Sequence, residues 1–472
     1  MAEEKIEEIL IEDAIQEYES KLSEFQESED YHDARERDFA IGVATPPALR
    51  TLLAQVGIPR IYISSLVERL NIEGFRQGGS HEADEELWSW FKANNLTTGS
   101  QMLHQDALVY GRAYITVAAP DEEDKENPLA VPDVPIIRVE SPKALYAHID
   151  PRTRAVQWAV RVVKNEDDEV VSATMYYPDR TILYISKEGV LTEDGTIQHG
   201  LGVVPVVPVI HTDSASDLYG KSAITPEIRS VTDATSRMMM NMQTTSELMA
   251  TPQRILFGTG VDEINPNSAS GLELYTSSYI AIEDPQGKAI QLPAAELRNY
   301  TEGLTHLLKM AAAYTGLPPQ YLSYSDDNPA SAEAINSSLD RLVRTCESLA
   351  ERFGDYWEQA MRIAMLVMGQ TLTLDHFRME TVWRDPSTPT YASKADAASK
   401  LYASGQGVIP LEQARIDMGY TPEQRRQMEE WDKQSPLAQM DRMYSGMPGS
   451  GPPEEDPEVT DEPGADGGEA GS

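Results

Sequence analysis

Carboxylates are the most abundant side chains in this sequence that could do chemistry. The run Asp121-Glu122-Glu123-Asp124 offers oxygen ligands of the kind a divalent cation prefers, but consecutive loop residues point in different directions. The pair His211 and Asp213 has no further ligand at a metal-binding spacing. The sequence has one cysteine, Cys346, and a single cysteine excludes a disulfide framework within the chain. Cys346 is predicted on the apolar face of a helix. We therefore expect no metal site and no cofactor.

Catalytic sequence motifs are also missing. The chain has no phosphate-binding loop, no dinucleotide-binding glycine motif, no HExxH and no GxSxG. A nuclease or hydrolase that uses carboxylates and two metal ions is the third choice among our interpretations, because no spacing of acids argues for it. The first prediction is therefore a protein that is not an enzyme.

The charge of the chain restricts its partners. Its 472 residues carry a formal net charge of −38, which argues against wrapping nucleic acid through phosphate contacts. An acidic wall would still let DNA slide past without sticking. The first residues lack a basic region followed by an apolar one, and no run of about 18 apolar residues is present. We expect a protein that folds in a reducing cytoplasm and is not inserted in a membrane.

Helical and strand periodicities predict an α+β first half. Residues 1–30 read as an exposed amphipathic helix that docks on a neighbour. Three further helices are predicted at Ala48–Leu70, Asp84–Asn94 and Thr98–Leu108. Strands joined by short turns are predicted at Val156–Val163, Val170–Tyr177 and Thr181–Ile185, as an antiparallel meander.

The second half is dominated by two amphipathic helices around a small insertion. The first is predicted from Ser222 to Met249 and the second from Pro293 to Gly316, each about 30–40 Å long at 1.5 Å per residue. Short strands are predicted between them at Arg254–Phe257, Leu272–Tyr275 and Tyr279–Ile282. Two rods around an extruded module describe a shaft rather than a pocket for a small substrate.

A loop follows the second rod. The two prolines in Leu317–Asn328 restrict this loop, and a long amphipathic helix then runs to Met368. A strand is predicted at Met379–Trp383 and two or three short helices within 390–435. From Ser445 the chain contains Gly, Pro and acids but no basic residue, which predicts a disordered tail.

Several segments resemble portal proteins of tailed bacteriophages. They are Tyr110-Gly111-Arg112-Ala113-Tyr114, Tyr219-Gly220-Lys221-Ser222 at the start of a long helix, and Gly316-Leu317-Pro318-Pro319-Gln320-Tyr321-Leu322 followed by Asn328-Pro329-Ala330-Ser331. The closest subgroup resembles the portal of Bacillus phage SPP1 and is common among siphophages of actinobacteria. The resemblance covers roughly residues 30–440.

The resemblance implies a portal fold: a helix-rich wing containing the β meander, a two-helix stem, a small α/β clip and a helical crown. The implied segments are the wing at 1–220, stem helix 1 at 221–250, the clip at 251–292, stem helix 2 at 293–316, a channel loop at 317–331, a long wing helix and return strand at 332–384, the crown at 385–446 and the acidic tail at 447–472.

The candidate site residues follow from this assignment. The channel loop is implied to contact DNA independently of base sequence and to carry negative charge near the narrowest point; its residues are Leu317, Pro318, Pro319, Gln320, Tyr321, Tyr324, Asp326 and Asp327. Packing within the stem is assigned to Ile228, Val231, Met238, Met242, Met249, Leu297, Leu304 and Leu308. Arg254 and Lys288 are candidates for docking at the clip, while Arg298 and Lys309 could line the channel.

The implied function is a ring, usually of twelve subunits, at one capsid vertex of the virion, assembled in the host cytoplasm. Double-stranded DNA would pass through it during packaging and ejection. The implied partners are the terminase large subunit, a head–tail adaptor, the major capsid protein and the scaffold, without a membrane. A head–tail adaptor or minor capsid protein is the alternative, although adaptors are usually shorter and lack the two rods.

Overall fold

The structure is a computed structural model of the chain. It describes residues 9–35, 55–78, 83–120, 133–187, 189–249, 254–257, 279–282, 290–291, 296–322, 332–387, 391–402, 407–420 and 422–434. The chain forms two compact units, residues 1–388 and 389–472. No helix in the described ranges is long and apolar enough to cross a membrane.

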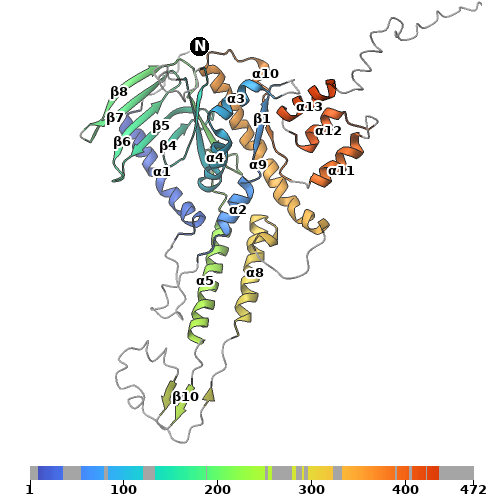
Figure 1. The fold of residues 1–472 in the computed structure, drawn as a ribbon. Helices are drawn as coiled ribbons and strands as arrows, with labels where there is room; N and C mark the ends of the chain where they lie inside the picture. Colours follow the sequence, from blue (N-terminus) through green and yellow to red (C-terminus); the bar gives the residue numbers. More distant parts are fainter. Residues whose placement is uncertain are drawn as a thin grey trace, which may run out of the picture. The chain divides into compact units, whose positions relative to one another are not determined.

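A five-stranded antiparallel meander lies on one side of the first unit (Figure 1). Its order follows the sequence: β4 (Leu145–Ile149), β5 (Val156–Lys164), β6 (Val170–Tyr176), β7 (Arg180–Lys187) and β8 (Val190–Gln198). The three strands predicted from period-two alternation are β5, β6 and β7. The strand β8 was not predicted, because most of its residues are exposed and show no clear alternation.

The N-terminal helix α1 (Ile11–His32) packs on this sheet. Ile11, Ala14 and Tyr18 are buried against Trp158 and Val160 of β5. The prediction of an exposed helix that docks on a neighbour was therefore wrong, because its apolar face is already covered within its own chain. The amphipathic pattern was read correctly, but it does not say which surface the helix covers.

A second sheet has the order β3-β2-β9 and is antiparallel throughout. Its strands are β2 (Arg112–Ala118), β3 (Ile136–Glu140) and β9 (Val206–Ile210). The central strand β2 is buried on both faces, with Ala113 and Ile115 fully covered. It forms the middle of the main hydrophobic core.

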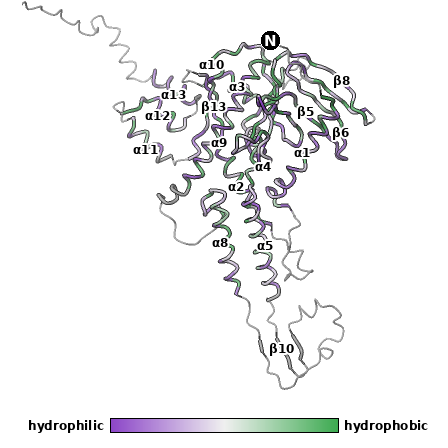
Figure 2. Tube along the Cα trace, turned by 180° about the vertical axis from the view of Figure 1, so that it is seen from behind, coloured by the Kyte–Doolittle hydropathy of each residue, from purple (hydrophilic) through white to green (hydrophobic). Residues whose placement is uncertain are grey.

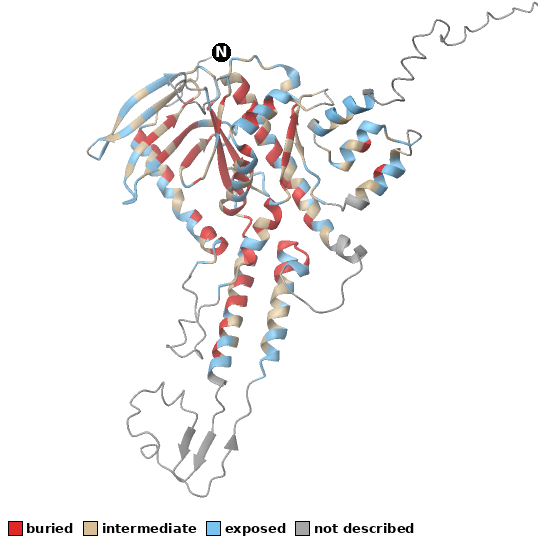
Figure 3. Cartoon of the chain, in the orientation of Figure 1, coloured by how far each residue is buried: buried red, intermediate tan, exposed pale blue. Residues whose placement is uncertain are grey.

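Helices close this core. They are α2 (Ile58–Val67), α3 (Glu85–Ala93), α4 (Leu96–Tyr110) and the 36-residue α9 (Ala332–Val367). Figure 3 shows buried residues from Leu342 onward along the part of α9 whose side chains are described. The predicted helix from Ala48 is confirmed only from Ile58, where Pro59 stands in the first turn rather than breaking the helix.

A two-stranded antiparallel sheet joins an early segment of the first unit to its last strand. It pairs β1 (Ile72–Arg76) with β13 (Glu380–Trp383), and the short helix α10 (Leu374–Phe377) precedes β13. The strand β13 was predicted, whereas β1 was not. Its partner lies about 300 residues away, so nothing local in the sequence marks the pairing.

The two predicted rods are present as α5 (Pro226–Met249) and α8 (Arg298–Thr315). Gly316 ends α8 in the left-handed conformation, as predicted. The chain between them forms β10 (Arg254–Phe257), β11 (Tyr279–Ile282) and β12 (Ile290–Gln291), with β10 in the middle and β11 parallel to it. The predicted strand Leu272–Tyr275 lies outside the described residues.

Within its described residues the second unit has three short helices, where two or three were predicted: α11 (Tyr391–Tyr402), α12 (Leu411–Met418) and α13 (Pro422–Gln434). Ion pairs join α12 to α13, with Arg415 to Asp432 and Arg425 to Glu412. Ala398 and Ala414 are buried. The predicted acidic tail from residue 445 lies outside the described residues.

Candidate functional site

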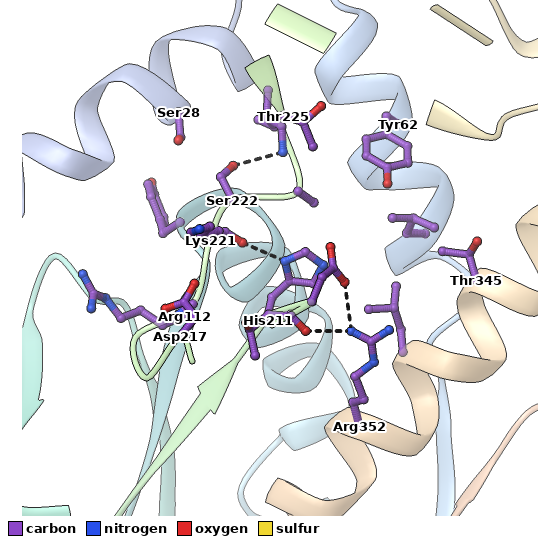
Figure 4. Close-up of a pocket in the computed structure, with 18 of the residues that line it drawn as sticks. Ser28, Tyr62, Arg112, His211, Asp217, Lys221, Ser222, Thr225, Thr345 and Arg352 are labelled. Carbon is purple, nitrogen blue, oxygen red and sulfur yellow. Dashed lines mark hydrogen bonds and ion pairs between the residues drawn. The ribbon is translucent and has the colours of Figure 1, made fainter. Parts of the chain in front are cut away.

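The start of α5 is fixed to the body by two glycines that belong to different sequence motifs. Gly111 ends α4 and Gly220 precedes α5, and both have positive φ, 86° and 79°. The His211 N–H donates to the carbonyl of Gly111 at 2.9 Å, and the Lys221 N–H donates to the carbonyl of His211 at 2.8 Å. The His211 ring also donates from Nδ1 to the Lys221 carbonyl at 2.7 Å (Figure 4). This junction sets the position from which α5 leaves the body.

Arg112 lies next to this glycine junction, and few acceptors surround its buried charge. Its side chain is only 4% exposed, and its one ion pair among the described residues joins Nη2 to Glu24 at 3.3 Å. Its Nε and Nη1 atoms have no hydrogen-bond partner. The guanidinium lies over the rings of Phe25 and Tyr219, at 4.9 and 5.3 Å from the ring centroids. The arginine therefore connects α1 to the segment that leads into α5.

The helices α5 and α8 pack against each other in antiparallel fashion. Val231 near the start of α5 clusters with Ala311 near the end of α8. A Cβ on Gly303 would touch Met238, and the hydroxyls of Thr245 and Tyr300 are 3.1 Å apart. The α5 residues in this seam recur at intervals of seven, as expected for two helices packed along their length.

The predicted stem-packing residues differ in burial. Ile228 and Val231 are buried within the chain, whereas Met238, Met242, Leu304 and Leu308 are half-buried and Leu297 is 39% exposed. The side chain of Met249 lies outside the described part. Figure 2 shows both hydrophobic and hydrophilic segments along this helix pair. The apolar residues of α8 that precede Met310 in the sequence are thus only partly covered by α5.

The exposed residues of α8 are mostly polar, although Leu297 and Tyr314 are also exposed. Arg298 is 82% exposed and forms an i,i+4 ion pair with Glu302 at 2.9 Å. Lys309 is also exposed. The structure therefore places both predicted basic residues on the surface of the helix.

The predicted channel loop is only partly exposed. Leu317 is 3% exposed and belongs to the main core, and Pro318 is buried beside it, so the expectation that these two face a channel was wrong. Pro319–Tyr321 form a 3₁₀ turn on the surface, and Arg69 donates to the Tyr321 hydroxyl at 3.0 Å. Tyr324, Asp326 and Asp327 lie outside the described residues.

Arg254 and Lys288 are the predicted docking residues of the segment between α5 and α8, and their side chains lie outside the described part of the structure. The backbone of Arg254 pairs with Tyr279 and Gln291 in the small sheet. Lys288 lies outside the described residues.

The described residues offer little for catalysis. They contain no group of three or more His, Cys, Asp or Glu side chains that could hold a metal ion. Burial raises the pKa of the Cys346 thiol to about 11, so the reactive thiolate does not form at neutral pH. Asp121-Glu122-Glu123-Asp124 fall outside the described part.

Comparison with known proteins decides the family. The family model described as phage portal protein, SPP1 Gp6-like, matches residues 11–439. The portal protein of Mycobacterium phage L5 is 49% identical over 436 residues, covering 90% of this chain and 88% of the relative. That of Mycobacterium phage D29 is 49% identical over 422 residues, covering 88% and 87%. The chain belongs to the SPP1 Gp6-like family of phage portal proteins. It is therefore a structural protein of a phage particle and not an enzyme.

Solved structures of gene transfer agent particles resemble this portal protein more distantly. A chain from the virion of a native particle has a TM-score of 0.43 at 14% identity, covering 84% of this chain and 99% of that chain. A chain from the neck of a native particle, computed with C12 symmetry, has a TM-score of 0.37 at 13% identity, covering 80% and 95%.

One feature of the portal protein was missed from the sequence. A cleft of about 1010 Å³ lies between α1, α9 and the segment that contains the glycine junction (Figure 4). Its lining includes basic residues from four separate segments: Arg112, Lys221, Arg229, Arg341, Arg344 and Arg352. Only the spacing of the three arginines of α9, on one side of the helix, could have indicated a basic face.

Proposed function

We propose that this portal protein forms a ring of twelve subunits at one vertex of the capsid, and that double-stranded DNA passes through its centre during packaging and ejection. The observation that carries the proposal is the antiparallel pair of α5 and α8. Leu304 and Leu308 are only half-buried, and Leu297 is exposed, on a helix whose main neighbour is α5. Such apolar surface is normally covered by association, and identical subunits around an axis cover it repeatedly.

The parts of the subunit are assigned from the resemblance to portal proteins. Residues 221–250 and 293–316 would form the stem, 251–292 the clip and 385–446 the crown. The wing would comprise 1–220 and 332–384. The small sheet of β10, β11 and β12 supports the clip assignment, because it is inserted between the two stem helices.

Passage of DNA would rely on weak contacts that do not depend on sequence. The net charge of −38 on each subunit disfavours tight binding of phosphates. The exposed turn Pro319–Tyr321 leads into Ser323–Ala330, which contains Asp326 and Asp327. We propose that these two acids form a ring of negative charge in the channel. Replacing both with lysine should slow or stall translocation in a DNA-packaging assay; unchanged packaging would contradict this role.

Docking is assigned to the clip and the wing. Arg254 and Lys288 are proposed to contact the terminase large subunit and then a head–tail adaptor, while the wing would face the major capsid protein and the scaffold. Assembly in the host cytoplasm is part of the same proposal. Charge reversal at Arg254 and Lys288 should weaken binding of the purified terminase large subunit without changing ring formation.

Negative-stain microscopy of the purified full-length protein tests the central claim. We expect rings with a central hole, and a mass by light scattering close to twelve subunits. A protein that remains monomeric at high concentration would contradict the proposed channel. Rings that assemble but fail to support packaging would instead favour a connector without a conducting role.

A further inference from the structure

The cleft between α1 and α9 carries positive charge in a strongly negative protein. Its lining has six basic side chains against four acidic ones, Glu24, Asp213, Asp217 and Asp340, whereas the whole chain has 77 acids against 39 lysines and arginines. The sign of the charge in the cleft is thus opposite to that of the whole chain. The net negative charge that keeps the protein soluble does not account for these basic residues, so a specific role must account for them.

The cleft side of α9 is a row of arginines on the face opposite the core. Leu342, Cys346 and Phe353 are buried in the main core. Arg341 and Arg344, by contrast, are exposed, at a spacing of three that places them side by side. Like charges at this spacing repel each other. Asp340, four residues before Arg344, also lines the cleft but forms no ion pair with it among the described residues.

These arginines are incompletely paired within the subunit. Arg352 forms an ion pair with Asp213 at 3.3 Å, and Arg229 forms one with Glu27 at 2.6 Å. Arg341 has no carboxylate partner among the described residues and donates to the carbonyl of Ala313 at 3.1 Å. Arg344 makes no hydrogen bond or ion pair in the described part of the chain, and neither does the ammonium group of Lys221 on the opposite wall. The cleft thus offers two free cations that face a common space.

The floor of the cleft adds to this charge. Arg112, which is almost completely buried, has two nitrogens without partners and a single ion pair of 3.3 Å. Its positive charge is shielded from solvent and acts on whatever occupies the cleft, since screening by water is weak there.

We propose that this cleft receives an acidic segment of a second copy of the chain, so that carboxylates of the neighbouring subunit pair with Arg344 and Lys221. The inference rests on the proposed ring. A second copy has the required chemistry, because its surface is dominated by carboxylates. Each subunit would then present a basic socket on one side and an acidic segment on the other, as a head-to-tail ring requires.

The cleft is a poor site for DNA. Its volume of about 1010 Å³ matches a few side chains or a small ligand rather than a duplex. Apolar residues of the lining, such as Tyr62 and Leu349, also suit contact with a protein.

Charge reversal at Arg344 tests the proposal. Arg344→Glu should lower the apparent association of subunits at least about tenfold, measured by mass photometry across a concentration series. The circular dichroism spectrum should not change, because the side chain makes no bond within the described chain. Arg138→Glu is the matched control, because Arg138 is exposed on β3, lies outside the cleft and makes no hydrogen bond or ion pair in the described part. Rings of Arg344→Glu that assemble like the parent would overturn the proposal.

Photo-cross-linking identifies the occupant directly. Benzoylphenylalanine at Thr345, which lines the cleft, should give covalent dimers in assembled rings, and mass spectrometry should place the second site in an acidic segment of the neighbour. Assembled rings that give cross-links only within one chain, only to DNA or not at all would refute the socket while leaving the ring intact. If the parent protein forms no rings, the proposed function fails and the socket fails with it.

Discussion

The backbone of Gly220 lies against the carbonyl oxygen of Gly111, so closely that a Cβ atom on Gly220 would be only 2.1 Å from it. Both residues have positive φ, and a Cβ on Gly111 would be 2.7 Å from the backbone of Lys221. Two motifs that are far apart in the sequence therefore meet at a contact that only glycine permits. The contact fixes where α5 begins.

Gly220→Ala should be strongly destabilising. The substitution adds a strained φ and a clash with backbone that cannot move aside, which together cost at least roughly 3 kcal/mol. Gly195→Ala is the control, since a Cβ there meets nothing within 4 Å. We expect a large drop in the thermal unfolding midpoint for the first variant and almost none for the second. Equal midpoints would contradict the close contact.

Trp357 and His104 should make stability depend on pH. Trp357 Nε1 donates to His104 Nε2 at 3.0 Å in the fully buried core, and burial lowers the pKa of His104 to about 3. In the unfolded chain His104 has an ordinary pKa near 6.5 and binds a proton below that pH, whereas in the folded chain it stays neutral. Stability is therefore lost as pH falls from 6.5 towards 3, by roughly 2 kcal/mol at pH 5.

The variant His104→Gln separates this contribution from that of the many carboxylates. Glutamine keeps an acceptor for Trp357 but does not titrate, so the loss of stability between pH 7 and pH 5 should be smaller than in the parent. Urea unfolding at the two pH values measures the difference. An identical pH dependence in both proteins would show that His104 does not contribute.

The ion pair of Arg112 with Glu24 should contribute more to the free energy of unfolding than its 3.3 Å length suggests. Glu24→Gln leaves a buried guanidinium without its ion-pair partner, and we expect a loss of roughly 1–2 kcal/mol, less than for a fully buried pair because Glu24 is half-exposed. The matched control is Glu27→Gln. Its partner Arg229 also donates to Ser28 and to the carbonyl of Ile224, so the loss should be smaller. Urea unfolding curves of the two variants that coincide would contradict this reading of Arg112.

The elements that could be predicted from sequence are those determined by local chemistry. Asp84 caps α3 and accepts from Leu87 at 3.0 Å, and the predicted helix begins there. The apolar register of α9 predicted most of its buried residues, including Cys346 and Trp357, but not Met361, Ile363 and Met365. Local signals of this kind persist whatever the tertiary structure is.

What could not be predicted depends on contacts between distant segments. The partner of α1 is a sheet more than a hundred residues away, and the basic cleft combines α9 with the segment before α5. Leu317 was assigned to a channel-facing loop by the resemblance to portal proteins, yet it is buried in the main core together with residues of α9. Neither composition nor periodicity carries the information that decides these placements.

Substitutions along the helix pair α5 and α8 should separate packing within a subunit from packing between subunits. Ile228 is 1% exposed in the main core, so Ile228→Ala should cost about 2–5 kcal/mol in unfolding of the monomer. Leu297 is 39% exposed, so Leu297→Ala should cost less than about 1 kcal/mol. If neighbouring subunits cover α8 in a ring, Leu297→Ala should nevertheless lower ring formation, measured by mass photometry at fixed concentration. Normal ring formation by Leu297→Ala would place this part of α8 away from any neighbouring subunit.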